Sequence, residues 1–222
     1  MKNIGILVAM PTELDLFAGS LENLHIKNIN PFRFFCGSID YKNIVVAQSG
    51  MGKVNAALCC QTLIREFSPD VIVHIGISGG LDSSLKIGDF VIGKDLVYHD
   101  VWCWEPNQYG QIQDMPASYY SDPKLVEKFK EYPSGLFCCG DRFISDKNEL
   151  ASIMQHFPHA LAVDMESTAV AQTCYLHNIP LLSIRQISDT PGIDNHMDQY
   201  EAFWKNAPKN SCATLKNILK KI

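Results

Sequence analysis

Short runs of apolar residues alternate along the chain with longer segments of mixed polarity, and this alternation limits the possible folds more than any other feature. The runs have the length of buried strands and are too short for buried helices. Residues 4–9 (IGILVA) form the first run, and Pro11 after it suits the first turn of a helix. Strands that alternate with helices predict a three-layer α/β fold.

The expected elements cover most of the chain. Strands are predicted at residues 4–9, 33–39, 43–49, 71–75, 87–98, 136–139 and 181–187. Helices are predicted at residues 54–67, 123–132, 146–157, 167–177 and over much of 199–221. Residues 102–120, rich in aromatic side chains, Gln and Pro, predict a long loop, and loops of that length are often functional. With no repeat or linker, we expect one domain over residues 1–222.

Charge and hydropathy argue against several classes of partner. A net charge of -5 argues against binding to a nucleic-acid backbone. No apolar run approaches the ~20 residues that span a bilayer, and the first run is too short for a signal peptide. We therefore expect a cytoplasmic protein with no nucleic-acid or membrane partner.

Cysteine and histidine give no sign of a disulfide framework or a metal site. Most of the eight cysteines lie inside apolar runs, and neighbours such as Cys59 and Cys60 lack CxxC spacing. The seven histidines show no HxxxH or HExxH pattern. We expect buried, reduced thiols and no bound metal.

Acidic residues follow three expected strands, at the strand ends where α/β folds bind ligands. Glu13 follows the first strand, Asp164 and Glu166 follow a short apolar run, and Asp189 follows the strand at 181–187. Each acid has an ordinary alternative role. Glu13 and Glu166 fit the first turn of a helix, and Ser188 with Asp189 fits a capping turn. In an extended segment, Asp164 and Glu166 would instead share one face.

Two glycine-rich turns, at residues 49–54 (SGMGKV) and 76–81 (GISGGL), are equally open to interpretation. Glycine lets a backbone approach a ligand closely, but it also serves any tight turn. The first turn lacks the spacing of a Walker loop, and Asn55 stands where a dinucleotide-binding motif needs its third glycine.

Seven motifs in a fixed order carry a resemblance to a known family. They are IGILVAMPTEL, SGMGKVNAAL, GISGGL, KIGDFVIG…YHD, GDRFI, VDMESTAVA and IRQISD. Together they resemble the 5′-methylthioadenosine/S-adenosylhomocysteine nucleosidases of the purine nucleoside phosphorylase superfamily, over almost the whole chain. The resemblance implies a three-layer α/β/α sandwich around a central mixed, barrel-like sheet. It also implies a homodimer that hydrolyses the bond between adenine and a 5′-thio-substituted ribose, with no cofactor and no metal.

The same resemblance implies two catalytic carboxylates. Glu13 matches the base that activates the attacking water, and Asp189 matches the general acid that protonates N7 of adenine. Breaking a glycosidic bond develops oxocarbenium character on the sugar, and adenine leaves poorly as an anion. The acid must therefore stay protonated at neutral pH, which burial favours.

The substrate contacts are implied in the same way. Glu166 matches the carboxylate that holds the ribose hydroxyls, Phe143 matches the ring that stacks on the purine, and Arg185 matches an arginine near the water. The remaining implied contacts are the Ile144 backbone at the base edge, Met165 under the sugar, Ser188 beside Asp189, and Met51 at the 5′ end.

The chain departs from the family pattern at three places. Ile77 stands where a small hydroxyl residue can help to hold the attacking water. Trp102 and Trp104 occupy the Val101–Trp104 loop, which in the family reaches the neighbouring subunit's pocket. Tyr200 replaces a phenylalanine over the 5′ group. The 5′ group therefore stays open between methylthioadenosine, adenosylhomocysteine, 5′-deoxyadenosine and aminofutalosine.

Two other functions compete with hydrolysis. A phosphorylase needs cations for phosphate, usually arginine, and the four arginines all lie outside the first loop and residues 71–80. His74 stands near where many phosphorylases place such an arginine, but a neutral imidazole is a weak substitute. A non-catalytic nucleoside-binding protein would not need Glu13, Glu166 and Asp189 together.

Overall fold

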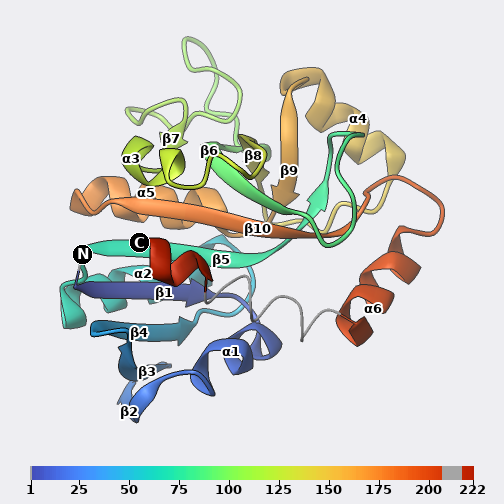
Figure 1. The fold of residues 1–222 in the computed structure, drawn as a ribbon. Coiled ribbons are helices and arrows are strands. Elements are labelled where there is room, and N and C mark those ends of the chain that lie inside the picture. Colours follow the sequence, from blue (N-terminus) through green and yellow to red (C-terminus); the bar gives the residue numbers. More distant parts are fainter. Residues whose placement is uncertain (1, 207–216) are drawn as a thin grey trace.

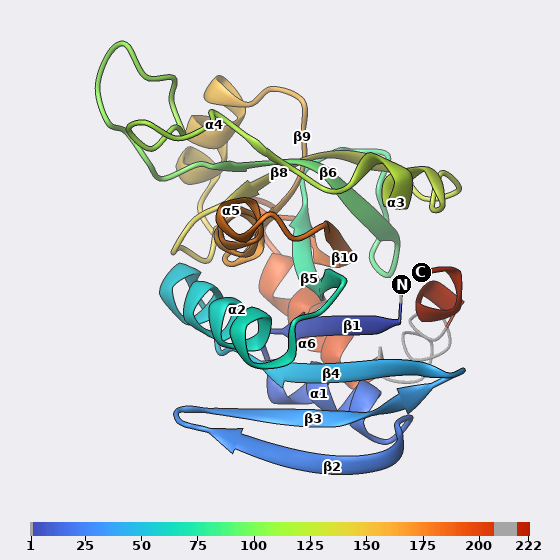
Figure 2. The same ribbon diagram turned by 90° about the vertical axis from the view of Figure 1, so that its left-hand side faces the viewer.

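A computed structural model describes residues 2–206 and 217–222, and it arranges them as helices around one large mixed sheet (Figures 1 and 2). The strands are β1 (Asn3–Val8), β2 (Glu22–Ile29), β3 (Phe32–Ile39), β4 (Lys42–Gln48), β5 (Val71–Gly80), β6 (Phe90–Tyr98), β7 (Tyr119–Tyr120), β8 (Ser134–Cys139), β9 (Ala160–Asp164) and β10 (Leu181–Asp189). The helices are α1 (Pro11–Ala18), α2 (Lys53–Phe67), α3 (Pro123–Glu127), α4 (Lys147–His156), α5 (Ser167–His177) and α6 (His196–Asn206). A further helical turn covers residues 217–221.

Five strands close on themselves into a barrel within this sheet. The path runs β10-β6-β8-β9-β5, and β5 pairs again with β10. The rest of the sheet continues from β5 through β1, β4 and β3 to β2. The α2 and α5 helices lie on one side of the sheet, and α3 and the turn at 217–221 lie on the other (Figure 2). The predicted three-layer sandwich with a barrel-like mixed sheet is confirmed.

The parallel pairs β1–β5 and β5–β10 place the ends of three strands at one edge. These strands are buried on both faces, and all nine residues of β10 are buried. Continuous burial explains the apolar runs with which β1 and β5 begin, as expected of strands covered on both sides, whereas β10 buries several polar side chains at its carboxyl end. Polar residues at the carboxyl ends of such strands therefore meet in one place.

The sequence misplaced several elements for identifiable reasons. The β2 strand was not predicted, because its residues are almost all exposed and lack the apolar pattern of a buried strand. The helix predicted at 123–132 ends at Glu127, where the chain continues in tight turns toward Pro133. The helix predicted over 199–221 begins earlier, at His196, and much of the remainder lies outside the described residues.

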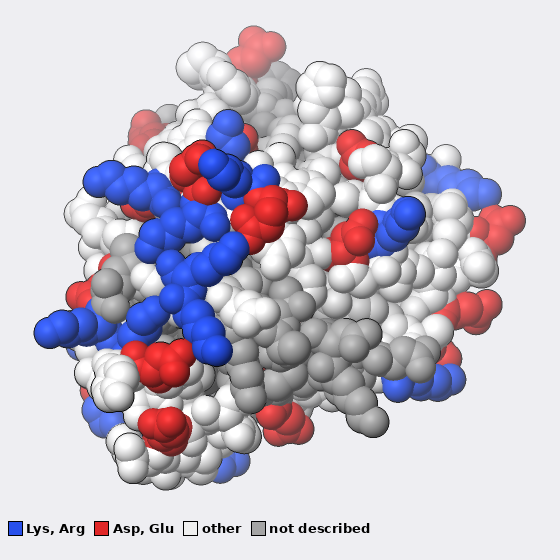
Figure 3. All heavy atoms as spheres, viewed as in Figure 1, with Lys and Arg blue, Asp and Glu red and all other residues white. Residues whose placement is uncertain are grey.

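Basic side chains gather on the side of the molecule where both chain ends lie (Figures 1 and 3). Lys42 Nζ donates to the Leu219 and Lys220 carbonyls, and Lys128 Nζ donates to the Lys221 carbonyl. These contacts satisfy carbonyls in the last helical turn. Among the described residues, no helix is long and apolar enough to span a membrane.

Candidate active site

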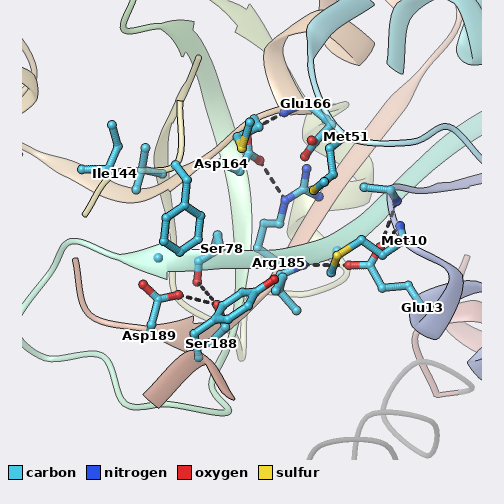
Figure 4. Close-up of a pocket in the computed structure, with 18 of the residues that line it drawn as sticks. Met10, Glu13, Met51, Ser78, Ile144, Asp164, Glu166, Arg185, Ser188 and Asp189 are labelled. Atoms are coloured by element: carbon cyan, nitrogen blue, oxygen red, sulfur yellow. Dashed lines mark hydrogen bonds and ion pairs between the residues drawn. The ribbon is translucent and has the colours of Figure 1, made fainter. Parts of the chain in front are cut away.

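One cavity lies at the carboxyl ends of β1, β5 and β10, and it contains every site residue proposed from the sequence (Figure 4). Its empty space, with the open solvent at the mouth included, is about 680 Å³. The proposed residues that line it are Glu13, Met51, Ile77, Phe143, Ile144, Met165, Glu166, Arg185, Ser188, Asp189 and Tyr200.

Glu13 stands in the first turn of α1 and is held entirely by backbone amides. Its Oε2 accepts hydrogen bonds from the Ala9 N–H at 2.9 Å and the Met10 N–H at 2.8 Å. Its Oε1 accepts one from the Ile77 N–H at 3.2 Å. Burial raises the pKa of Glu13, while these three amides and Arg185 oppose the rise. Glu13 thus both caps the first turn of α1 and lines the cavity.

Asp189 ends β10 with a single side-chain donor. The Ser188 hydroxyl donates to Asp189 Oδ1 at 2.6 Å and also lies 3.2 Å from the Ser78 carbonyl. Burial raises the pKa of Asp189, against weaker opposing effects from Ser188 and His196. Because Oδ1 accepts the hydrogen bond from Ser188, we expect the protonated carboxyl group to carry its proton on Oδ2. The β5–β10 register shifts between Ile187 and Asp189, and such a bulge lets neighbouring residues face the same cavity.

Arg185 and Asp164 form a buried ion pair beside Glu13. Arg185 Nε lies 2.8 Å from Asp164 Oδ2, and both side chains are at most 2% exposed. Asp164 Oδ1 accepts hydrogen bonds from the Glu166 and Ser167 N–H groups at the start of α5. The charge of the guanidinium is therefore matched inside the protein (Figure 4).

Glu166 is the N-cap residue of α5, as its helix-terminus interpretation predicted. Its Oε1 accepts a hydrogen bond from the Gly52 N–H at 2.8 Å, across the cavity from α5. Gly52 has a φ of 93°, which only glycine adopts easily. Burial, followed by the charge of Asp164, raises the pKa of Glu166 to about 7. The first glycine-rich turn thus brings a backbone amide to a carboxylate in the cavity.

Aromatic and apolar residues form the mouth of the cavity. The Phe143 ring meets Tyr200 edge to face, with centroids 5.5 Å apart, and Phe143 is 44% exposed. Met51 is 61% exposed. Neither Trp102 nor Trp104 lines this cavity. An accessible ring at the mouth suits stacking on a planar ligand.

Sequence reasoning gave no role in the cavity to several further lining residues, among them Met10, His74, Arg142 and Pro191. His74 is 1% exposed and lies against Arg185, and no local motif marks it. Arg142 forms an ion pair with Glu149. Within the described ranges, no three His, Cys, Asp or Glu residues are grouped as a metal site would require.

Known proteins match the chain over nearly its full length. The model of the phosphorylase superfamily matches residues 3–220. A 5′-methylthioadenosine/S-adenosylhomocysteine nucleosidase of Staphylococcus aureus is 36% identical over 228 residues, which cover 99% of this chain and 100% of that relative.

Solved structures agree with the sequence match. The nucleosidase of Neisseria meningitidis, in complex with methylthio-immucillin-A, has a TM-score of 0.93 and 34% identity, with 100% of both chains covered. The Colwellia psychrerythraea nucleosidase, in complex with adenine, has a TM-score of 0.94 and 31% identity, covering 100% of this chain and 96% of that one. This chain therefore belongs to the phosphorylase superfamily and, within it, to the 5′-methylthioadenosine/S-adenosylhomocysteine nucleosidases.

Proposed function

We propose that this protein hydrolyses the N-glycosidic bond of a 5′-substituted adenosine such as 5′-methylthioadenosine or S-adenosylhomocysteine and releases adenine. One observation carries the proposal. A buried acid with a single hydroxyl partner, Asp189, and a carboxylate held by three amides, Glu13, face one cavity. Two relatives, 31% and 34% identical to this chain, have structures in complex with adenine and with methylthio-immucillin-A, respectively.

The two acids take different roles in this proposal. Asp189 gives the proton on Oδ2 to N7 of adenine, so the base leaves as a neutral molecule. Glu13 takes a proton from the water that attacks C1′ of the ribose. Each such proton transfer contributes ~100- to 10,000-fold to the rate. Glu166 accepts hydrogen bonds from the ribose hydroxyls, and positive charge on the sugar develops near three carboxyl groups.

The remaining site residues position the substrate. Phe143 stacks on the purine, and the Ile144 backbone binds the base edge. Met165 packs under the sugar. At the 5′ end, Met51 and Tyr200 contact the substituent, which stays open among the four 5′ groups named above.

The arginines favour water over phosphate as the attacking group. Of the four arginines, all within the described residues, Arg142 and Arg185 line the cavity. Arg142 is paired with Glu149, and Arg185 is paired with Asp164. Phosphate would need at least one guanidinium free of a carboxylate partner, so we expect hydrolysis rather than phosphorolysis.

The test is release of adenine from methylthioadenosine, first in phosphate-free buffer and then with added phosphate. We expect equal release in both buffers, with free 5-methylthioribose as the second product. Release that requires phosphate and yields a sugar phosphate would replace the proposal with phosphorolysis. Tight nucleoside binding without release would favour the non-catalytic alternative.

We further propose a homodimer. The exposed faces of α2 and α5 carry large apolar side chains, and the neighbouring 101–104 loop carries two tryptophans. They are Val54, Leu58, Trp102, Trp104, Tyr175 and Leu176, each at least 48% exposed. Exposed apolar clusters of this kind mark interfaces. In this arrangement, the Val101–Trp104 loop lies near the 5′ end of the partner subunit's cavity.

Light scattering on a sizing column tests the dimer. Leu58→Glu, on α2, should give a monomer, whereas Tyr41→Glu, at a fully exposed turn between β3 and β4, should leave the dimer intact. A wild-type monomer would contradict the proposal. We also expect a cytoplasmic, single-domain enzyme of methionine salvage, and the seven free thiols among the described residues fit a reducing compartment.

A further inference from the structure

His74 lies beneath the cavity in an unusual relation to Arg185. Its side chain, on β5, is 1% exposed. Arg185 Nη2 lies 3.2 Å from His74 Nδ1 and 3.3 Å from Nε2. A hydrogen bond in the plane of the ring would bring the donor close to one nitrogen and leave the other far away. Nearly equal distances therefore place Nη2 over the face of the imidazole, as in a cation–π contact.

The other nitrogens of Arg185 contact Asp164 and backbone carbonyls, among them that of His74 itself, 3.5 Å from Nη1. Nε faces Asp164 Oδ2 at 2.8 Å, and Nη1 donates to the Ile184 carbonyl at 2.9 Å. Among the described residues, the aromatic ring that contacts Nη2 of Arg185 is the imidazole of His74. Without the ring, the Nη2 end would lose this support, and only the contacts of Nε and Nη1 would fix the guanidinium.

The imidazole is suited to this contact because it stays neutral. Burial, and then the positive charge of Arg185, hold the pKa of His74 well below its usual range. A neutral aromatic face attracts a cation, whereas a protonated ring would repel it.

Arg185 and Glu13 both lie close to Gly76, which has no side chain to separate them. A Cβ atom on Gly76 would lie 3.2 Å from Glu13 Oε1 and 3.6 Å from Arg185 Cζ. The guanidinium and the carboxylate therefore both border the space that a side chain at Gly76 would fill. Arg185 also opposes the rise in the pKa of Glu13 that burial causes.

We propose that His74 is a positioning residue for the hydrolysis: the face of its ring fixes the Arg185 guanidinium beside Glu13 and the cavity. The inference rests on the proposed function, because it assigns the water-activating role to Glu13. The charged groups around Glu13 are Arg185 from β10 and Glu166 from the start of α5. Asp164 at the end of β9 pairs with Arg185, and His74 adds a ring without charge.

Two variants separate the aromatic face from its nitrogens. His74→Ala removes the ring, and His74→Phe keeps an aromatic face without titratable atoms. We expect His74→Ala to lower kcat/KM about tenfold, between the values for an exposed and a desolvated cation–π contact. Its acid limb in the pH profile should move up by about one pH unit, because Glu13 loses the nearby cation. His74→Phe should restore most of both.

A core substitution away from the cavity provides the matched control. Cys59→Ala, on the buried face of α2, should lower thermal stability without moving the acid limb. An acid limb for His74→Ala that coincides with that of the wild type would overturn the proposal. So would a His74→Phe variant as impaired as His74→Ala, since the ring nitrogens would then be what matters.

Crystal structures of both variants give a readout that is independent of activity. We expect Arg185 to turn away from Glu13 in His74→Ala and to keep its place in His74→Phe. An unmoved Arg185 in His74→Ala would overturn the positioning role. A wild-type enzyme that releases no adenine would instead defeat the proposed function, and the structural comparison would still decide the role of His74.

Discussion

The two ends of the cavity treat buried carboxyl groups in opposite ways. At the end that holds Glu13, Asp164 and Glu166, Arg185 pairs with Asp164 and opposes the rise in the pKa of the two glutamates, and all three carboxyl groups accept hydrogen bonds from backbone amides. At the other end, the Ser188 hydroxyl is the one donor to Asp189 among the described residues. Burial raises the pKa of Glu13, Glu166 and Asp189 alike. The donors around each carboxyl group therefore decide whether it serves as a base or keeps its proton as an acid.

Removing the acid at the sparsely bonded end should have the largest effect. Asp189→Asn keeps the shape of the side chain but cannot protonate adenine. We expect kcat for adenine release to fall ~100- to 10,000-fold, the usual contribution of a general acid. Steady-state kinetics with methylthioadenosine would measure this loss.

Nucleoside binding distinguishes lost chemistry from lost structure in this variant. Asp189→Asn should bind an unreactive adenosine analogue within severalfold of the wild type and unfold at a similar temperature. Retained turnover would remove Asp189 from the role of proton donor and break the contrast between the two ends.

Glu166 tests the densely bonded end through stability. Its pKa is raised from 4.5 to about 7 in the folded protein. Below pH 4.5 the folded and unfolded states are both protonated, and burial of this group has no charge penalty. Between the two values the unfolded state ionises first, so the folded state loses stability as the pH rises. The loss is complete above about pH 7 and amounts to roughly 3 kcal/mol at most.

Glu166→Gln should remove this loss while keeping an acceptor for the Gly52 N–H. We expect the ligand-free variant to melt at a higher temperature than the wild type at pH 8 and at a similar temperature near pH 4.5. Its KM should rise, because a neutral amide binds ribose hydroxyls more weakly. Glu22→Gln, at an exposed position on β2, is the control. A variant with the same pH dependence as the wild type would show that Glu166 carries no such penalty.

The acids at the two ends of the cavity could be predicted from the sequence, but the hydrogen-bond donors that make the two ends differ could not. Buried strands such as β1 and β10 are visible as apolar runs, and the acids that follow them mark the cavity. The exposed β2 strand has no such pattern and was missed. Sequence motifs identified Glu13 and Asp189. The three amides that hold Glu13 come from two separate segments, which only the folded chain brings together.

His74 shows the same limit at the level of one residue. A lone histidine in an apolar strand gives no sign of a partner more than a hundred residues away in sequence. The parallel pairing of β5 with β10 sets Ser183 beside His74 and Arg185 beside Gly76. Contacts of this kind depend on strand pairing and register, and strands buried on both faces, such as β5 and β10, lack the alternating pattern that would reveal them.

Ser188→Ala should sharpen the comparison with a smaller effect. The Ser188 hydroxyl stabilises the ionised form of Asp189 and leaves Oδ2 as the site of the proton. Without it, the pKa of Asp189 should rise further, and the alkaline limb of the kcat profile should move up by about one pH unit. The proton would also lose its fixed place, so we expect kcat near neutral pH to fall about tenfold. An alkaline limb that stays in place would mean that Ser188 does not act through Asp189.

Ile77 should show the smallest effect, at the boundary between the two ends. Its N–H binds Glu13 Oε1, and its side chain lines the cavity without a polar atom. Ile77→Ser would add a hydroxyl that can hold the attacking water, and one such hydrogen bond predicts a rise in kcat of about threefold to tenfold. Ile77→Ala separates the hydroxyl from the added space, because it widens the cavity equally. A gain in both variants would show that the isoleucine limits access. A gain in the serine variant alone would show that the densely bonded end still lacks one donor for water.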